Sequence, residues 1–223
     1  MFSSSFLDNG AQYLSTTSGL LVKDAEGQHY VICALHGFLK DRIVFHPDPI
    51  KGRQIGKVVQ RIPNVDVGLV RLEPGIRYTN EFFESEGEAS GVTPRRFAAS
   101  EYGDCLEMDN PYSRSCTAIV VGVNHILENT EYHQHDWQIF ERGIAANEGS
   151  SSSPILYENG RVVAIFRFVD KTNPKCGFGV TGAEVEKLGL ELVEKDILKG
   201  ATPGRQSSGS SSDSLLSLLR DFR

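Results

Sequence analysis

The chain has 223 residues, of which 39% are hydrophobic and 23% charged, a composition typical of a globular protein with a sizeable core. Its formal net charge is −6 and it has no basic stripe with interleaved aromatic residues, so nucleic-acid binding is not favoured. The sequence has neither a run of about eighteen apolar residues nor the basic and apolar start of a secretory signal, so we expect a cytoplasmic protein without membrane spans.

Short apolar runs rich in β-branched residues predict strands in the first third of the chain. They are residues 18–23, 29–34, 42–45, 54–61 and 67–72. The first two flank a short turn that contains Gly27, which predicts a hairpin. Closely spaced short strands favour a barrel or a sandwich.

Residues 73–116 have a weaker pattern, are acidic and contain scattered glycine and proline, so we interpret them as the connection between two halves. Strands resume in the second half, at residues 117–124, 137–140, 153–157, 161–169 and 176–181. The turn Asn159-Gly160 between two apolar runs is a strong hairpin signal. Apolar residues at helical spacing then predict a helix over 183–198.

The C-terminus differs in composition from the rest of the chain. Residues 201–212 are rich in serine and glycine and predict a flexible linker. Residues 213–223 place Leu215, Leu219 and Phe222 on one helical face. Two interpretations stay open: a frayed tail or a helix that packs on its own domain, and a tethered helix that docks on a partner.

The four cysteines are Cys33, Cys105, Cys116 and Cys176, and no pair has the spacing of a metal site. Cys105 and Cys116 flank a polar loop and would be able to form a disulfide in an oxidising compartment, but we favour four free thiols. Residues 133–136 (HQHD) lack a third spaced ligand and are interpreted as an exposed loop. No metal or organic cofactor is expected.

Three polar residues lie at the ends of predicted strands, in an order that suggests catalysis. His36 follows the run 30–34, Asp66 precedes the run 67–72, and serines fill residues 150–153. Alone, each has a simpler explanation: a structural histidine, a turn aspartate and a polar loop. Together they supply a base, a carboxylate that orients it and a hydroxyl nucleophile, in a chain order known for the catalytic triad.

The segments around these residues resemble the trypsin/chymotrypsin-like serine protease superfamily. Residues 34–36 (ALH) resemble its Ala-Ala-His segment, residues 64–72 (NVDVGLVRL) its Asp-Ile-Ala-Leu-Val-x-Leu strand, and residues 149–154 (GSSSSP) its Gly-Asp-Ser-Gly-Gly-Pro turn. The spacing is similar to that of the compact bacterial, viral and heat-shock-type branches. The resemblance implies an all-β fold with two six-stranded antiparallel barrels and a C-terminal α-helix.

On this resemblance, residues 1–200 form one protease domain, with barrels at about 15–80 and 112–182 and the active site between them. His36 is implied as the base, Asp66 as the orienting carboxylate and Ser151 as the nucleophile, with Ser152 as the alternative if the turn is shifted by one. The backbone N–H groups of Gly149 and Ser151 would form the oxyanion hole.

The substrate pocket is implied to include Ala145, Ala146 and Arg167. Ala145 lies near the position where trypsin-like enzymes carry aspartate, so no preference for lysine or arginine is expected. Arg167 either points away from the pocket or favours an acidic substrate residue.

Three departures from the family pattern affect the expected activity. Ser150 replaces an aspartate that serves zymogen activation, which suggests that no such switch exists, and Ser152 and Ser153 replace two glycines. A Cβ at residue 152 strains the turn if the backbone there needs a positive φ. The expected function is therefore a serine endopeptidase acting on peptides or proteins, and the alternative is a catalytically inactive binding or scaffold protein.

Overall fold

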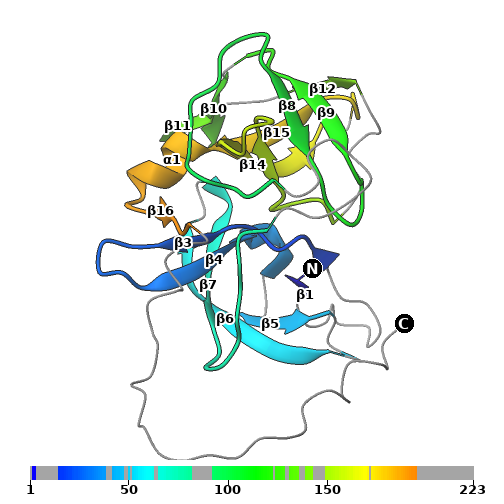
Figure 1. The fold of residues 1–223 in the computed structure, drawn as a ribbon. Coiled ribbons are helices and arrows are strands. Elements are labelled where there is room, and N and C mark those ends of the chain that lie inside the picture. The colour runs from blue at the N-terminus through cyan, green and yellow to red at the C-terminus, as the bar shows by residue number, and fades with distance from the viewer. Residues whose placement is uncertain are drawn as a thin grey trace, which may run out of the picture.

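The computed structural model describes residues 2–3, 15–38, 42–47, 50, 52–62, 65–81, 92–122, 124–128, 131–135, 139–142, 149–170 and 172–194. Almost all regular structure in these residues is antiparallel β-sheet, arranged as two curled sheets that lie one above the other (Figure 1). The predicted all-β class with two barrels is confirmed.

The first barrel is an eight-stranded sheet in the order β16-β3-β4-β7-β6-β5-β1-β2. Its strands are β1 (Phe2–Ser3), β2 (Ser15–Thr16), β3 (Leu21–Lys23), β4 (His29–Ala34), β5 (Ile43–His46), β6 (Arg53–Ile62), β7 (Val67–Leu72) and β16 (Glu191–Leu192). The predicted hairpin is β3–β4, with Leu21 opposite Val31. The sheet has more strands than the predicted six. The strands that the sequence does not predict, β1, β2 and β16, have only two residues each, which is too few to leave a pattern in the sequence.

The second barrel is a six-stranded sheet in the order β12-β9-β8-β13-β14-β15. Its strands are β8 (Cys105–Met108), β9 (Cys116–Ile119), β12 (Ile139–Arg142), β13 (Pro154–Leu156), β14 (Val162–Val169) and β15 (Gly177–Thr181). β8 corrects our assignment of residues 73–116 to a connection and our barrel boundary at residue 112. Its alternation is short, with Leu106 and Met108 buried and Cys105 exposed.

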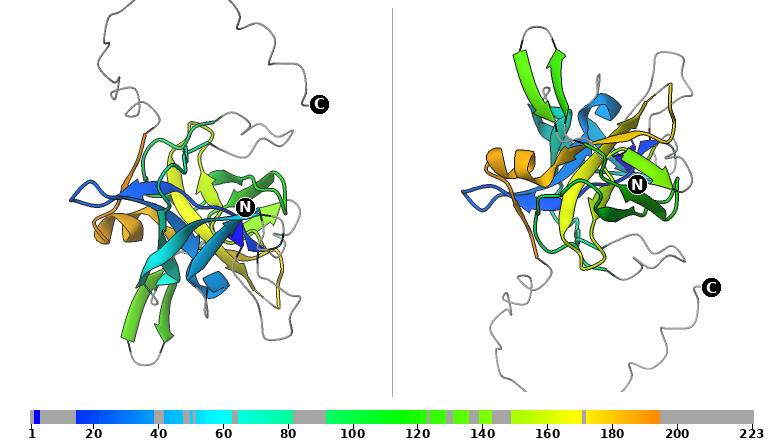
Figure 2. Two further views of the ribbon diagram at one scale, coloured as in Figure 1. Left: turned by 90° about the horizontal axis from the view of Figure 1, so that it is seen from below. Right: turned by 90° about the horizontal axis from the view of Figure 1, so that it is seen from above.

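A separate hairpin joins β10 (Asn124–Glu128) to β11 (Glu131–His135). It projects from the body of the molecule (Figure 2). The loop expected at residues 133–136 is therefore wrong for residues 133–135, which belong to β11 and pair with β10.

The C-terminal helix is shorter than the sequence predicts. α1 spans Gly182–Lys187, so residues 188–194 of the predicted helix 183–198 are not helical, and residues 195–198 lie outside the described residues. The Thr181 side chain caps the N-terminus of α1 by accepting the Glu184 N–H. The helix ends because Gly189 adopts a φ of 74°, a conformation that terminates helices. Leu192, which has the right spacing for a helical face, instead pairs with Val22 of β3. Pairing with a sheet edge has overridden the local helical pattern.

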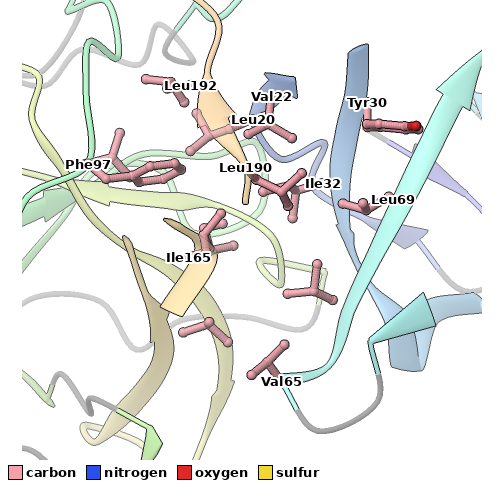
Figure 3. Close-up of a cluster of buried hydrophobic side chains, with 14 residues drawn as sticks. Leu20, Val22, Tyr30, Ile32, Val65, Leu69, Phe97, Ile165, Leu190 and Leu192 are labelled. Atoms are coloured by element: carbon pink, nitrogen blue, oxygen red, sulfur yellow. The ribbon is translucent and has the colours of Figure 1, made fainter. Parts of the chain in front are cut away.

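The three largest apolar clusters of the described residues hold the fold together. One fills the first barrel around Val31, Val44 and Val70, and one fills the second barrel around Leu106 and Ile155. The third cluster lies between the barrels (Figure 3) and its labelled members are Leu20, Val22, Tyr30, Ile32, Val65, Leu69, Phe97, Ile165, Leu190 and Leu192. Burying each large aliphatic side chain contributes about 1.5–3 kcal/mol, so this shared core fixes one barrel against the other.

The cysteine alternatives are resolved by the β8–β9 pairing. Cys105 lies opposite Ile119, whereas Cys116 lies opposite Met108 at the other end of the ladder. The two are about 10 Å apart along the strands, which is too far for a disulfide. All four cysteines are free thiols.

Two further expectations concern parts of the chain beyond this description. The predicted linker 201–212 and the predicted tail 213–223 lie outside the described residues. Within the described ranges, no helix has the length and apolar character needed to cross a membrane.

Candidate active site

His36 and Asp66 are brought together by the pairing of β4 with β7. Ala34 lies opposite Val67, so the 3-10 helix η1 (Leu35–Phe38) begins beside the residue that precedes β7. His36 Nδ1 lies 2.6 Å from Asp66 Oδ2, and the His36 backbone N–H donates to Asp66 Oδ1 at 2.8 Å. One carboxylate therefore fixes both the backbone and the ring of the histidine.

The geometry of this pair determines which histidine nitrogen is available for chemistry. Nδ1 faces the carboxylate, so a neutral ring with its proton on Nδ1 leaves Nε2 as an acceptor. The side chain of His36 is 48% exposed while that of Asp66 is 11% exposed. The histidine can therefore be reached from outside, and the carboxylate that orients it is shielded.

The serine turn at residues 149–153 belongs to the second barrel but is bonded to the first. Gly149 O accepts from Thr17 N at 2.8 Å, and Ser151 O accepts from Thr16 Oγ1 at 2.5 Å. Within the turn, Ser153 N donates to Ser150 O at 3.1 Å. The shared apolar core and these bonds together fix the position of the turn relative to η1.

Ser152 is a structural residue in this turn. Its φ is 79°, so the positive φ that was considered for this position is present, and it is carried by a residue with a Cβ. The side chain is fully buried, and its Oγ accepts from Ala34 N at 2.6 Å and lies 3.4 Å from Thr16 Oγ1. Because this hydroxyl is buried and already bonded, it is not placed to act as the alternative nucleophile.

Ser151 is partly exposed and its hydroxyl donates to the backbone oxygen of Arg167 at 2.7 Å. No hydrogen bond joins Ser151 to His36 within the described residues. The backbone N–H groups of Gly149 and Ser151 donate to no partner in that part of the chain. The turn thus has one partly exposed hydroxyl and two backbone N–H groups without a partner among the described residues.

Ser150 occupies the position at which the resembled family often has aspartate. Its buried Oγ lies 2.5 Å from Ser113 Oγ and donates to Asn110 Oδ1 at 3.2 Å. Gly149 has a φ of 92°, and a Cβ there would lie 2.6 Å from the ring of Tyr112. The segment around residues 110–113 therefore supports the turn from beneath, a role that nothing in its sequence indicated.

Arg167 lies beside the His36–Asp66 pair and contacts it. Its Nε is 3.4 Å from Asp66 Oδ2, and its guanidinium carbon is 5.5 Å from the centre of the Phe168 ring. The Asp66 carboxylate is thus flanked by an imidazole and a guanidinium. The other predicted pocket residues, Ala145 and Ala146, lie outside the described residues.

Cys33 lies beneath this region and is 1% exposed. Burial, and to a lesser degree the Asp66 charge, raises the pKa of the Cys33 thiol well above its usual range. A thiol that stays protonated is a poor nucleophile, so the chemistry available here is that of the hydroxyl.

Comparison with solved structures identifies the fold, whereas comparison of the sequence identifies no family. No protein-family model and no curated protein matches the chain. Among solved structures, a glutamic acid-specific serine protease described as using a histidine triad in substrate binding is similar, with a TM-score of 0.64 and 14% identity over 82% of this chain and 94% of that one.

Two bacterial proteases are also similar to this chain in structure. A protease of M. tuberculosis in its active form has a TM-score of 0.59 and 16% identity, over 83% of this chain and 76% of that one. Protease A of Thermobifida fusca has a TM-score of 0.58 and 14% identity, over 83% of this chain and 94% of that one. The chain therefore has the chymotrypsin-like two-barrel fold that these serine proteases share.

Proposed function

We propose that the protein is a serine endopeptidase that hydrolyses peptide bonds in peptide or protein substrates. The observation that carries the proposal is the His36–Asp66 pair, in which one shielded carboxylate bonds both the ring and the backbone of an accessible histidine. The fold supports it, because the structures of similar fold are serine proteases. A carboxylate bonded in this way is what a general base needs to keep one tautomer and one orientation.

In the proposed reaction, Ser151 Oγ attacks the scissile carbonyl carbon while His36 Nε2 takes the hydroxyl proton. The imidazolium that forms is stabilised by Asp66, and it gives this proton to the leaving amine as the peptide bond breaks. Water then attacks the acyl-enzyme, with His36 again accepting a proton and returning it to Ser151. The Ser151 hydroxyl must first rotate from the Arg167 carbonyl, to which it donates, toward His36.

The two N–H groups of Gly149 and Ser151 are proposed as the oxyanion hole. Backbone donors of this kind, aimed at the oxygen that becomes negative, typically contribute about 10²–10³ in rate for each donor. Ala145, Ala146 and Arg167 remain the proposed walls of the substrate pocket. With Arg167 Nε directed at Asp66, its terminal nitrogens are the part left for a substrate.

A fluorophosphonate probe tests this proposal because it reacts only with an activated serine. We expect the native protein to be labelled and Ser151→Ala to lose the label, while Ser115→Ala, a change in a turn of the second barrel, keeps it. Labelling that survives Ser151→Ala would place the nucleophile elsewhere.

The alternative function, a catalytically inactive binding or scaffold protein, is favoured by two observations at the turn. The Ser151 hydroxyl is bonded to Arg167 O and not to His36, and Ser152 holds a strained φ where the family pattern has glycine. A folded native protein that the probe does not label, and that does not hydrolyse a small peptide ester, would support this alternative.

A further inference from the structure

A hollow of about 630 Å³ lies at the opposite end of β14 from the candidate active site. Three arginines line it: Arg95 and Arg96 from one segment, and Arg161 from the residue before β14. Arg161 and Arg167 are six residues apart on an extended strand, which separates this hollow from Asp66 by about 20 Å. We call it the arginine groove.

The arginine groove has a rigid backbone frame. Arg95 N donates to Gly160 O at 3.0 Å, and Val162 N donates to Arg96 O at 2.8 Å. Gly160 has a φ of 83°, and a Cβ there would lie 2.5 Å from the Thr93 oxygen, so the two segments pack closely because residue 160 is glycine. The spacing between the arginine Cα atoms is therefore set by the fold before any ligand arrives.

The side chain of Arg161 is also held in place. Its guanidinium carbon lies 4.5 Å from the centre of the Tyr157 ring, and its Nε donates to Asn159 Oδ1 at 3.2 Å. Tyr157 is itself fixed, because its hydroxyl bonds to Asp104 and to Ala99 O. Stacking and the Nε bond orient the guanidinium and leave its two terminal nitrogens as a fork for a bidentate acceptor.

The charges in the arginine groove are not balanced. Three arginines and one glutamate, Glu194, line it, and none of the three arginines is in an ion pair with another described residue, although Asp104 is near enough to interact electrostatically with Arg161. The chain as a whole has a formal net charge of −6, so the charge of this groove is opposite in sign to that of the whole chain. Unpaired arginines on a rigid frame favour a ligand that carries several negative charges.

We propose that the arginine groove is a binding site for an acidic peptide segment, distinct from the site of bond cleavage. The volume is that of a typical ligand site and exceeds what a single small ion fills. Carboxylates spaced along a peptide match guanidinium groups spaced along two backbone segments. The net negative charge of the chain disfavours a nucleic acid as the ligand. This proposal does not depend on peptide-bond hydrolysis.

The test measures binding to the full chain with Ser151→Ala, so that no probe is cleaved. The probe is a fluorescein-labelled nonapeptide in which glutamate alternates with glycine, and its control has glutamine for glutamate. We expect anisotropy to show binding of the glutamate peptide alone, weakening as salt rises. Arg95→Glu/Arg96→Glu should weaken binding by about tenfold or more, as should Arg161→Gln.

The matched control is Arg53→Glu, an exposed arginine of β6 in the first barrel, which should bind the probe as well as the parent does. Arg95 and Arg96 are exposed, so their replacement leaves the fold intact even if Arg161→Gln disturbs the stacking on Tyr157. Equal binding of the glutamine peptide, or an equal loss with Arg53→Glu, would overturn the proposal. Displacement of the probe by an oligouridylate of equal charge at lower concentration would also overturn it, because phosphate would then be the preferred ligand.

Discussion

The two halves of the candidate active site are held in different ways. The His36–Asp66 half is assembled within one barrel, by strand pairing and by one carboxylate that makes two bonds. Each half contains a residue with a Cβ at positive φ, Asp66 at 53° and Ser152 at 79°, but the serine turn also depends on bonds to residues more than a hundred positions away. The first half needs only a correctly paired sheet, whereas the second needs both barrels to be docked.

The largest effect on activity is expected from a change in the His36–Asp66 half. Asp66→Asn should leave the fold intact because the side chains are nearly isosteric, but it should remove the acceptor that sets the tautomer of His36. Hydrolysis of a small peptide ester should fall by about 10⁴-fold, the loss typical of this change in a Ser–His–Asp triad. Asp24→Asn, in the distant β3–β4 turn, is the control. Full activity in Asp66→Asn would show that Asp66 is a turn residue without a role in catalysis.

The serine turn should respond in stability first. Ser152→Ala keeps the strained φ and leaves the buried Ala34 N–H without its acceptor, which should cost about 1–3 kcal/mol in the free energy of unfolding. Ser152→Gly loses the same bond but relieves about 1–2 kcal/mol of backbone strain. Urea denaturation should therefore show the alanine variant to be less stable than both the native protein and the glycine variant. An alanine variant as stable as the native protein would show that the Ser152 bond contributes nothing.

A smaller effect is expected from the link between the barrels. Thr16→Val removes the hydroxyl that donates to Ser151 O while keeping the shape of the side chain. The loss of one such bond should lower stability by about 1 kcal/mol and reduce ester hydrolysis through kcat more than through KM, since the turn shifts relative to His36. Thr117→Val, on the exposed side of β9, should change neither quantity. Equal behaviour of the two variants would contradict the linking role.

The smallest effect is expected from the C-terminus. Removing residues 201–223 should leave the hydrolysis of a small ester unchanged, because no residue of either half lies there. Binding to a protein partner, or self-association, is the property that the removal should alter. A truncated protein that folds but no longer cleaves the ester would mean that the tail belongs to the site.

The same difference between the halves explains what the sequence can predict. His36 and Asp66 each adjoin a strand with a clear apolar pattern, so their meeting follows once those strands pair. Gly149 and Pro154 mark the serine turn in the sequence, but no sequence pattern marks the residues that bond to the turn and support it. Thr16 and Asn110 are ordinary residues in weakly patterned segments, and their contacts depend on docking over long sequence separations.

The assignment of the helix beyond residue 187 failed for a related reason. The spacing of Leu192 and Val193 suits a helical face, and it also suits a short strand with an adjacent buried residue. Only the open edge of β3 selects between the two, and that edge is provided by residues at the other end of the chain.

The position of β16 has a consequence for the order of events during synthesis on the ribosome. β3 is an edge of the first barrel until Glu191 and Leu192 pair with it, and these residues are made after every strand of the second barrel. A nascent chain therefore carries an unpaired strand edge for most of its translation, a state that invites pairing with other chains. A ribosome that stalls before residue 191 releases a product whose first barrel cannot close this edge.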